Sequence, residues 1–191
     1  MIPNVKTDRL ALRTFLETDA EAAEQLLMDA GWANMSKPLS DRLAHQRRYL
    51  AWGQENDFFH KSMSQFPYGD RAIVLQKTAE FIGIIGLVPV AVPLGQLPSQ
   101  GGQLNSRSSA EVGLYWSVLA AHRGRGYATE AAAGLIQYMF ETFDLNRIIA
   151  TTSRDNAASQ QVMRKLGMRV EENPFERPEW FQVVGMIENK H

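Results

Sequence analysis

Alternating apolar and polar positions predict most of the strands of this chain. In residues 8–15, Leu10 and Leu12 fall on one face, a two-residue period typical of a strand with one buried side. Residues 110–118 show the same period. Further strands are expected at 71–76, 80–88, 147–152, 169–171 and 180–188, with a hairpin connection at 77–79.

Four helices are expected where the apolar period lengthens. Thr18 and Glu21 fit a capping box, which predicts a helix from there to about Met28. A second helix is predicted to open at Ser40–Asp41, and a third to span 126–143. The fourth is predicted to run from Asp155 or Asn156 to Leu166, and Gly167 fits a left-handed C-cap there. The order β-α-α-β-β-β-α-β-α-β-β predicts a mixed α/β sheet with a central βαβαβ section.

Two segments break the pattern. Residues 56–69 contain a turn at 67–70 and are interpreted as a loop. Residues 89–109 hold three prolines, three glycines and four serines, with few large apolar side chains after Leu97. A flexible loop insert is predicted there, because unstructured loops of this length are uncommon in compact domains and tend to be functional or disordered.

Composition narrows the protein's class. The 191 residues fit a single domain, 1–191, and a net charge of −1 argues against nucleic-acid binding through bulk positive charge. The chain has no cysteine, which excludes disulfides, thiolate–metal sites and a cysteine nucleophile and fits a reducing compartment. The most apolar run, 81–95, is too short and too interrupted to span a membrane. No signal peptide is recognised, so a cytoplasmic location is predicted.

The candidate chemistry concentrates in residues 123–130, Arg-Gly-Arg-Gly-Tyr-Ala-Thr-Glu, where a predicted strand gives way to a helix. The first N–H groups of a helix lack intrahelical partners, and the helix dipole adds partial positive charge. Gly124 and Gly126 would let a phosphate approach the main chain, while Arg123 and Arg125 add cations. The segment predicts a phosphate site, with a glycine turn and solvated arginines as the alternative. It fits neither a Walker A loop nor a dinucleotide fingerprint.

Taken together, the motifs of this chain resemble those of the GNAT acyltransferase superfamily, and especially its RimJ/RimL branch of ribosomal-protein N-terminal acetyltransferases. Arg123-x-x-Gly126-x-Ala128 matches the superfamily signature. The other matching stretches are Thr7-Asp8-Arg9-Leu10-x-Leu12-Arg13, Ile82-Gly83-x-x-Gly86-Leu87, Glu111-Val112-Gly113-Leu114-Tyr115-Trp116, Gly126-Tyr127-Ala128-Thr129-Glu130-Ala131, Asn156-x-Ala158-Ser159 and Lys165-Leu166-Gly167-Met168. They occur in the family's order over about residues 7–187, and the predicted element order is also that of a GNAT fold.

The resemblance implies acetyl-CoA as co-substrate. The loop and first turn of the helix at 124–128 would hold the pyrophosphate through backbone amides. Residues 116–118 would pair with the pantetheine, with the Val118 N–H as an oxyanion donor. Lys165 would reach a phosphate, with a solvated helix charge as the alternative. The implied cofactor-binding residues are Trp116, Ser117, Val118, Arg123, Gly124, Arg125, Gly126, Tyr127, Ala128, Asn156, Ser159 and Lys165.

Two residues are candidates for proton transfer. Glu111 is a candidate base, directly or through water, with a structural carboxylate as the alternative. Many GNAT enzymes protonate the thiolate with a tyrosine at the position of Met163, which cannot donate a proton. Ser159 is therefore the candidate acid, with helix capping as the alternative. Without a cysteine or a recognisable Ser-His-Asp constellation, direct attack of the amine in a ternary complex is favoured.

The predicted acceptor is a primary amine, and a protein or peptide N-terminal α-amino group is the first hypothesis. The alternatives are a small amine, such as a polyamine, an amino acid or an antibiotic, and a catalytically weak acyl-CoA-binding sensor. The four histidines show no metal-ligand spacing, so no metal is expected. No nucleic-acid or membrane partner is expected, and monomer and homodimer both stay open.

Overall fold

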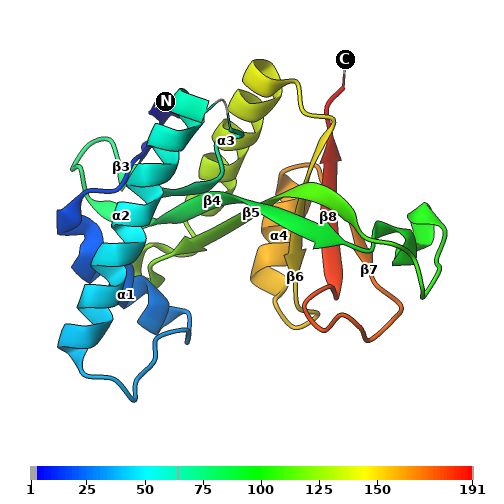
Figure 1. The fold of residues 1–191 in the computed structure, drawn as a ribbon, viewed down its shortest axis with the longest axis horizontal. Helices are drawn as coiled ribbons and strands as arrows, with labels where there is room; N and C mark the ends of the chain where they lie inside the picture. The colour runs from blue at the N-terminus through cyan, green and yellow to red at the C-terminus, as the bar shows by residue number, and fades with distance from the viewer. Residues whose placement is uncertain (1–3, 64, 191) are drawn as a thin grey trace. The chain divides into compact units, whose positions relative to one another are not determined.

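The computed structural model of the protein describes residues 4–63 and 65–190 as a mixed α/β fold. The helices are α1 (Ala20–Asp29), α2 (Leu39–Met63), α3 (Tyr127–Phe143) and α4 (Ala157–Lys165). The strands are β1 (Val5–Lys6), β2 (Leu10–Arg13), β3 (Gly69–Leu75), β4 (Phe81–Val92), β5 (Ser109–Val118), β6 (Arg147–Thr152), β7 (Arg169–Glu172) and β8 (Val183–Glu188). They form one mixed sheet in the order β1-β2-β3-β4-β5-β6-β8-β7 (Figure 1).

The chain divides into two compact units, each built from separate stretches of sequence. The first unit comprises Met1–Gly86 and Trp116–Gly134, and the second comprises Leu87–Tyr115 and Leu135–His191. Strands β4 and β5 and helix α3 contribute residues to both units. Within the described ranges, no helix is both long enough and apolar enough to cross a membrane.

The first unit is built around β2. This strand pairs antiparallel with β1, with Val5 opposite Leu12, and with β3, with Leu10 opposite Leu75. Leu10 and Leu12 are fully buried while their neighbours on the strand are half-buried, as the alternating pattern predicted. Helix α2 packs closely against the Phe15 side chain at Gly53, because a Cβ atom added to Gly53 would lie 3.3 Å from the Phe15 ring.

The second unit is built around β8. This strand pairs antiparallel with both β6 and β7, and β5 pairs parallel with β6 where Gly113 lies opposite Ile149. Gly185 of β8 leaves room for α4, because a Cβ atom there would lie 3.1 Å from the side chain of Met163. One buried apolar cluster joins β6, β8 and the segment that follows β4; it contains Val92, Leu94, Leu97, Ile149, Phe181, Val184 and Met186.

The capping box predicted from Thr18 and Glu21 is wrong. Residues Glu17–Asp19 form a 3-10 turn, and α1 begins only at Ala20. The carboxylate of Asp19 accepts the backbone N–H of Leu16 at 2.7 Å and is also held by both terminal nitrogens of Arg13, at 2.6 and 2.8 Å. The buried Asp19 carboxylate and Arg13 therefore organise this turn, and the spacing of residues around Thr18 does not reveal Arg13 as the partner.

Much of the loop predicted at 56–69 is helical. Helix α2 continues to Met63, and β3 begins at Gly69. The sequence contains neither glycine nor proline from residue 54 to residue 66, so the first strong helix breaker is Pro67. Exposed aromatic residues such as Phe58 obscured the helical period, because apolar side chains here do not lie on the buried face alone.

The segment 89–109 also differs from the predicted loop. Strand β4 continues to Val92, and two 3-10 turns follow, at Leu94–Gln96 and Pro98–Gln100. Apolar side chains of this stretch enter the buried cluster of the second unit. Gln96 is buried beside them, where its amide oxygen accepts the Asn173 amide N–H at 2.8 Å and its amide nitrogen donates to the Leu104 carbonyl at 2.9 Å.

Candidate active site

The loop between β5 and α3 has the backbone geometry of an anion site. Gly124 and Gly126 adopt φ angles of 75° and 81°, which side-chain-bearing residues rarely adopt. Helix α3 begins at Tyr127, and its first backbone bond runs from the Glu130 N–H to the Gly126 carbonyl at 3.0 Å. The N–H groups of the first turn therefore lack intrahelical partners, as an anion site requires.

Arg123 supports this loop from within the first unit. Its Nε donates to the Val118 carbonyl at 2.9 Å, and a terminal nitrogen donates to the Asp29 carbonyl at 3.2 Å. The Asp29 carboxylate in turn accepts the backbone N–H of Ala120 at 2.6 Å, and this bond, with one from Gln25, lowers the pKa of Asp29. Arg123 and Arg125 are both exposed, but the phosphate contact predicted for Arg123 competes with this bracing role.

Arg9 holds the other side of the loop. A terminal nitrogen of Arg9 donates to the Arg125 carbonyl at 3.1 Å, and its guanidinium carbon lies 4.5 Å from the centre of the Tyr127 ring. Its Nε bonds Glu130 Oε2 at 2.6 Å, while Glu130 Oε1 accepts the Arg9 N–H at 2.8 Å and the Thr7 hydroxyl at 2.6 Å. The motifs that contain Thr7, Arg9 and Glu130 were identified in the sequence, but no role was predicted for these side chains.

The end of β5 packs tightly on β4 in the first unit. A Cβ atom on Gly83 would lie 2.3 Å from the Ser117 carbonyl oxygen, so only glycine fits there. The Leu119 N–H donates to the Ile82 carbonyl at 2.9 Å. The carbonyl of Val118 is occupied by Arg123, and the predicted pairing of Trp116, Ser117 and Val118 with the pantetheine stays a prediction.

Glu111, the candidate base, lies in an ion pair within the second unit. Only 8% of Glu111 is exposed. Arg147 donates two hydrogen bonds to its carboxylate, from Nε to Oε2 at 2.7 Å and from Nη2 to Oε1 at 2.6 Å. The Ser109 hydroxyl also donates to Oε1, at 2.7 Å. Burial raises the pKa of Glu111, but the bonds from Arg147 and Ser109 outweigh it, so the pKa lies below its ordinary value. A carboxylate held this way is a weak proton acceptor, which favours the structural alternative.

Helix α4 carries the other catalytic candidates. Asn156 is its N-cap, and the side-chain oxygen of Asn156 accepts the Ser159 N–H at 3.0 Å. Asn156 therefore supplies the cap, and Ser159 is half-buried in the first turn. Exposed Lys165 ends the helix about 9 Å beyond Ser159 along the helix axis, at 1.5 Å per residue. Met163 is fully buried against Gly185, so the side chain at the family's tyrosine position faces the core.

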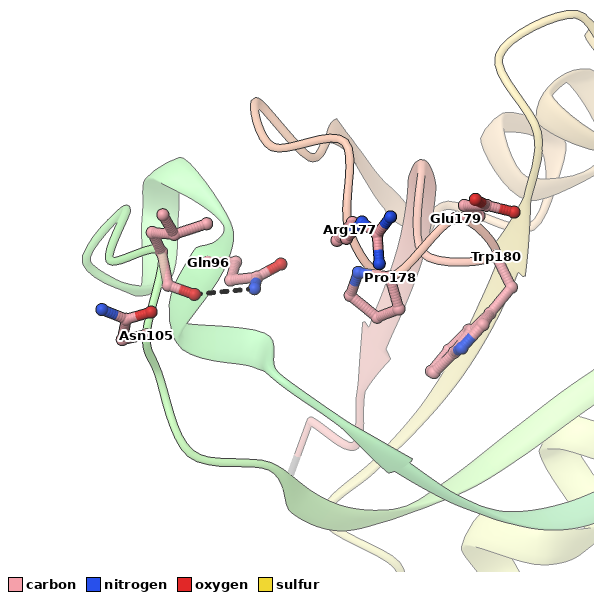
Figure 2. Close-up of a pocket in the computed structure, with 7 residues that line it drawn as sticks. Gln96, Asn105, Arg177, Pro178, Glu179 and Trp180 are labelled. Carbon is pink, nitrogen blue, oxygen red and sulfur yellow. Dashed lines mark hydrogen bonds between the residues drawn. The ribbon is translucent and has the colours of Figure 1, made fainter.

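The second unit also contains a pocket of about 580 Å³, lined by both polar and apolar residues. Figure 2 shows Gln96 and Asn105 contributed by the segment after β4, and Arg177–Trp180 by the connection from β7 to β8. Trp180, expected to open a late strand, instead precedes β8 and is 47% exposed. In the part of the chain that the structure describes, no three His, Asp or Glu side chains gather as a metal site.

Comparison with known proteins identifies the family. The family model of the acetyltransferase (GNAT) domain matches residues 9–169. The uncharacterised N-acetyltransferase YoaA of Bacillus subtilis (strain 168) is 25% identical over 185 residues, which cover 90% of this chain and 85% of YoaA.

Solved structures share the fold. The acetyltransferase from Agrobacterium tumefaciens str. C58 matches with a TM-score of 0.65 and 25% identity, over 98% of this chain and 95% of that one. RimL, a ribosomal L7/L12 alpha-N-protein acetyltransferase solved with coenzyme A, matches with a TM-score of 0.60 and 15% identity, over 96% and 95% of the two chains. The predicted mixed α/β fold and the resemblance to GNAT acetyltransferases are confirmed, RimL shares the fold, and the chain belongs to the GNAT family of acetyltransferases, enzymes that use acetyl-CoA.

Proposed function

We propose that the protein transfers the acetyl group of acetyl-CoA to a primary amine, and that the first acceptor class is the α-amino group of a protein or peptide N-terminus. The likeness to RimL supports this acceptor as a fold-level analogy. The observation that carries the co-substrate assignment is the β5–α3 loop, where two left-handed glycines precede a helix N-terminus and a cation is exposed beside them.

The residues of the first unit fit a CoA pyrophosphate. The N–H groups of Gly126, Tyr127 and Ala128 and the exposed Arg125 side chain would bind its charged oxygens. The backbone of 116–118 would orient the pantetheine, with the Val118 N–H polarising the carbonyl that is attacked. In the second unit, Asn156, Ser159 and Lys165 remain the candidates for the rest of the co-substrate.

Acetyl-CoA supplies an activated thioester, so the protein has to orient it and move protons. The attacking amine must be neutral; it loses a proton as the C–N bond forms, and the departing thiolate gains one. Ser159 is the proposed proton donor. Because Glu111 is held by Arg147 and Ser109, we assign it a structural role and infer that the amine proton leaves through solvent or another group.

The test is an acceptor panel. Peptides beginning with Ser, Ala or Met are compared with a polyamine, free amino acids and an aminoglycoside antibiotic, with thiol release as the readout. We expect sustained release with one or more peptides. Release with small amines alone would instead establish the small-amine alternative and exclude the peptide acceptor.

The buried Met163 favours one second candidate, a catalytically weak acyl-CoA sensor. Its side chain cannot donate a proton and faces the core. This candidate predicts that acetyl-CoA raises the melting temperature, because a ligand specific for the folded state stabilises it, while no amine in the panel supports turnover. Steady thiol release with any amine excludes it.

A further inference from the structure

The Thr7–Arg9 segment and Glu130 have no role in the function assigned so far. We propose that Thr7, Arg9 and Glu130 form a clamp that holds the β5–α3 loop in its phosphate-binding conformation before acetyl-CoA arrives. The inference rests on the proposed pyrophosphate site and assigns three positioning residues to it. All three side chains belong to the first unit.

The clamp joins the segment before β2 to one face of α3. Tyr127, Glu130 and Gly134 are three and four residues apart, so they share that face. Arg9 lies over the Tyr127 ring, and Glu130 accepts the Thr7 hydroxyl. A Cβ atom on Gly134 would lie 2.6 Å from the Thr7 methyl carbon, so a glycine lets the segment lie directly against the helix.

Arg9 acts on the orientation of a peptide group in the loop. Its terminal nitrogen donates to the Arg125 carbonyl at 3.1 Å. Because the carbonyl of a trans peptide and the following N–H point in opposite directions, this bond turns the Gly126 N–H away from Arg9. The orientation needs a left-handed Gly126, and a Cβ atom there would lie 3.6 Å from the Arg9 guanidinium.

Glu130 fixes the orientation of Arg9 itself. Its two oxygens accept the Thr7 hydroxyl, the Arg9 backbone N–H and Arg9 Nε, which leaves a terminal nitrogen aimed at the loop. Burial raises the pKa of Glu130, but the bonds from Thr7 and Arg9 outweigh it, and the pKa lies below its ordinary value. Glu130 is therefore ionised at neutral pH and offsets the charge of Arg9, so the clamp contributes geometry more than positive charge.

The clamp has a quantitative consequence for binding. When only a fraction of the free protein holds the loop in its binding conformation, the apparent Kd rises by the inverse of that fraction. Loss of one hydrogen bond to a charged group corresponds to about a tenfold change in that equilibrium. Bound acetyl-CoA itself orders the loop, so kcat at saturation is expected to change less than twofold.

The experiment separates geometry from charge. Arg9→Ala removes the contact with the Arg125 carbonyl, and Thr7→Val removes the hydroxyl held by Glu130 without changing any charge. Thr7→Ser is the conservative rescue. Gln137→Ala is the matched control on α3, because it removes a side-chain bond to Glu141 far from the loop. Acetyl-CoA Kd by calorimetry, KM and kcat, and hydrogen exchange of residues 124–128 in the free protein are measured.

The expected result is a rise in Kd and KM of at most about tenfold for Arg9→Ala, because Kd scales with the inverse of the competent fraction, and a smaller rise for Thr7→Val, with faster exchange at 124–128 and rescue by Thr7→Ser. Wild-type exchange in folded Arg9→Ala and Thr7→Val would overturn the clamp. That exchange needs no ligand, so it tests the clamp even if the wild-type protein fails to bind acetyl-CoA. Such a failure of wild-type binding would count against the proposed function instead.

Discussion

At the scale of single residues, Glu111 gives the clearest separation of a structural from a catalytic role. Its carboxylate is bonded by Arg147 and Ser109, and its pKa is lowered despite burial. A carboxylate with a lowered folded-state pKa stabilises the protein above its unfolded-state pKa. This contribution is lost as the pH falls through the lowered folded-state value.

We predict that Glu111→Gln destabilises the protein by about 1–2 kcal/mol at neutral pH, a Tm loss of about 2–8 °C, because Arg147 loses its charged partner. The Arg147 side chain is 32% exposed, so water limits the loss. The difference in Tm between wild type and variant should shrink as the pH falls from about 5 towards 3. Thermal unfolding across this range measures it.

The catalytic alternative for Glu111 makes a different prediction. A general base contributes about 10²–10⁴-fold in rate, and its titration shapes the acid limb of the kcat/KM profile. If Glu111→Gln loses that much activity while remaining folded, and also loses the acid limb, the structural assignment is wrong. An unchanged profile with modest activity loss supports it.

Substitutions at Gly126 test whether acetyl-CoA binding depends on the backbone conformation of the β5–α3 loop or only on the overall stability of the protein. Its φ of 81° makes an alanine strained by about 1–2 kcal/mol, and the strain relaxes by moving the loop. Gly126→Ala should therefore weaken acetyl-CoA binding about tenfold, and Gly126→Glu should abolish it by placing a carboxylate against the pyrophosphate. The measurement is isothermal titration with acetyl-CoA.

The matched control is Gly102→Ala. Gly102 also has a left-handed φ, of 64°, and a Cβ atom there meets nothing within 4 Å. It should lose comparable stability yet keep the wild-type affinity. Equal affinity losses in Gly102→Ala and Gly126→Ala would mean that general destabilisation, and not the loop, explains the effect.

At the scale of elements, the helices and strands that could be predicted from the sequence are those marked by residues close to one another in the chain. The alternation in β2 and the Asn156 and Gly167 ends of α4 could be predicted because each depends on neighbouring residues. The start of α1 could not be predicted, because the Arg13–Asp19 pair organises a 3-10 turn at the position where Thr18 had been expected to cap the helix. The end of α2 was missed because its apolar residues do not keep to the buried face.

Asn156 is the observed N-cap of α4, and the family resemblance also implies a hydrogen bond from Asn156 to the pantetheine amide; two variants separate these roles. Asn156→Asp keeps an oxygen to accept the Ser159 N–H but loses the amide donor, whereas Asn156→Ala loses both. We expect Asn156→Ala to cost about 1 kcal/mol of stability and Asn156→Asp almost none. If the amide binds the pantetheine, both variants should raise the acetyl-CoA KM about five- to tenfold. Wild-type KM in Asn156→Asp would leave Asn156 as a cap only.

At the scale of the whole molecule, the contacts that complete the site and the insert join distant parts of the sequence. Thr7 and Glu130 are 123 residues apart, and Gln96 and Asn173 are 77 apart. The motifs were recognisable one by one, but no periodicity relates such positions. For this reason the glycine turn and helix start of the β5–α3 loop could be predicted from the sequence, while the supports of this loop and the order of the 89–109 segment could not.

The buried pair of Gln96 and Asn173 leads to a prediction about the insert. Asn173→Ala leaves the Gln96 amide oxygen without its partner in a site where both residues are at most 5% exposed. This should cost about 1–3 kcal/mol. We expect amides of 94–104 to exchange almost as slowly as those of β8 in the wild type, and markedly faster in Asn173→Ala.

Ser99→Ala provides the control for this insert. It removes a contact with Glu171 from the same segment, but at an exposed position where water replaces the lost bond. Its exchange and stability should stay close to wild type. Rapid exchange of the 94–104 amides already in the wild type would contradict the prediction that the Gln96–Asn173 pair orders this segment. Such a segment would open independently of the sheet, so the buried pair could not be holding it in place. Slow exchange retained in Asn173→Ala would assign that order to the apolar cluster around Leu94 and Leu97 instead.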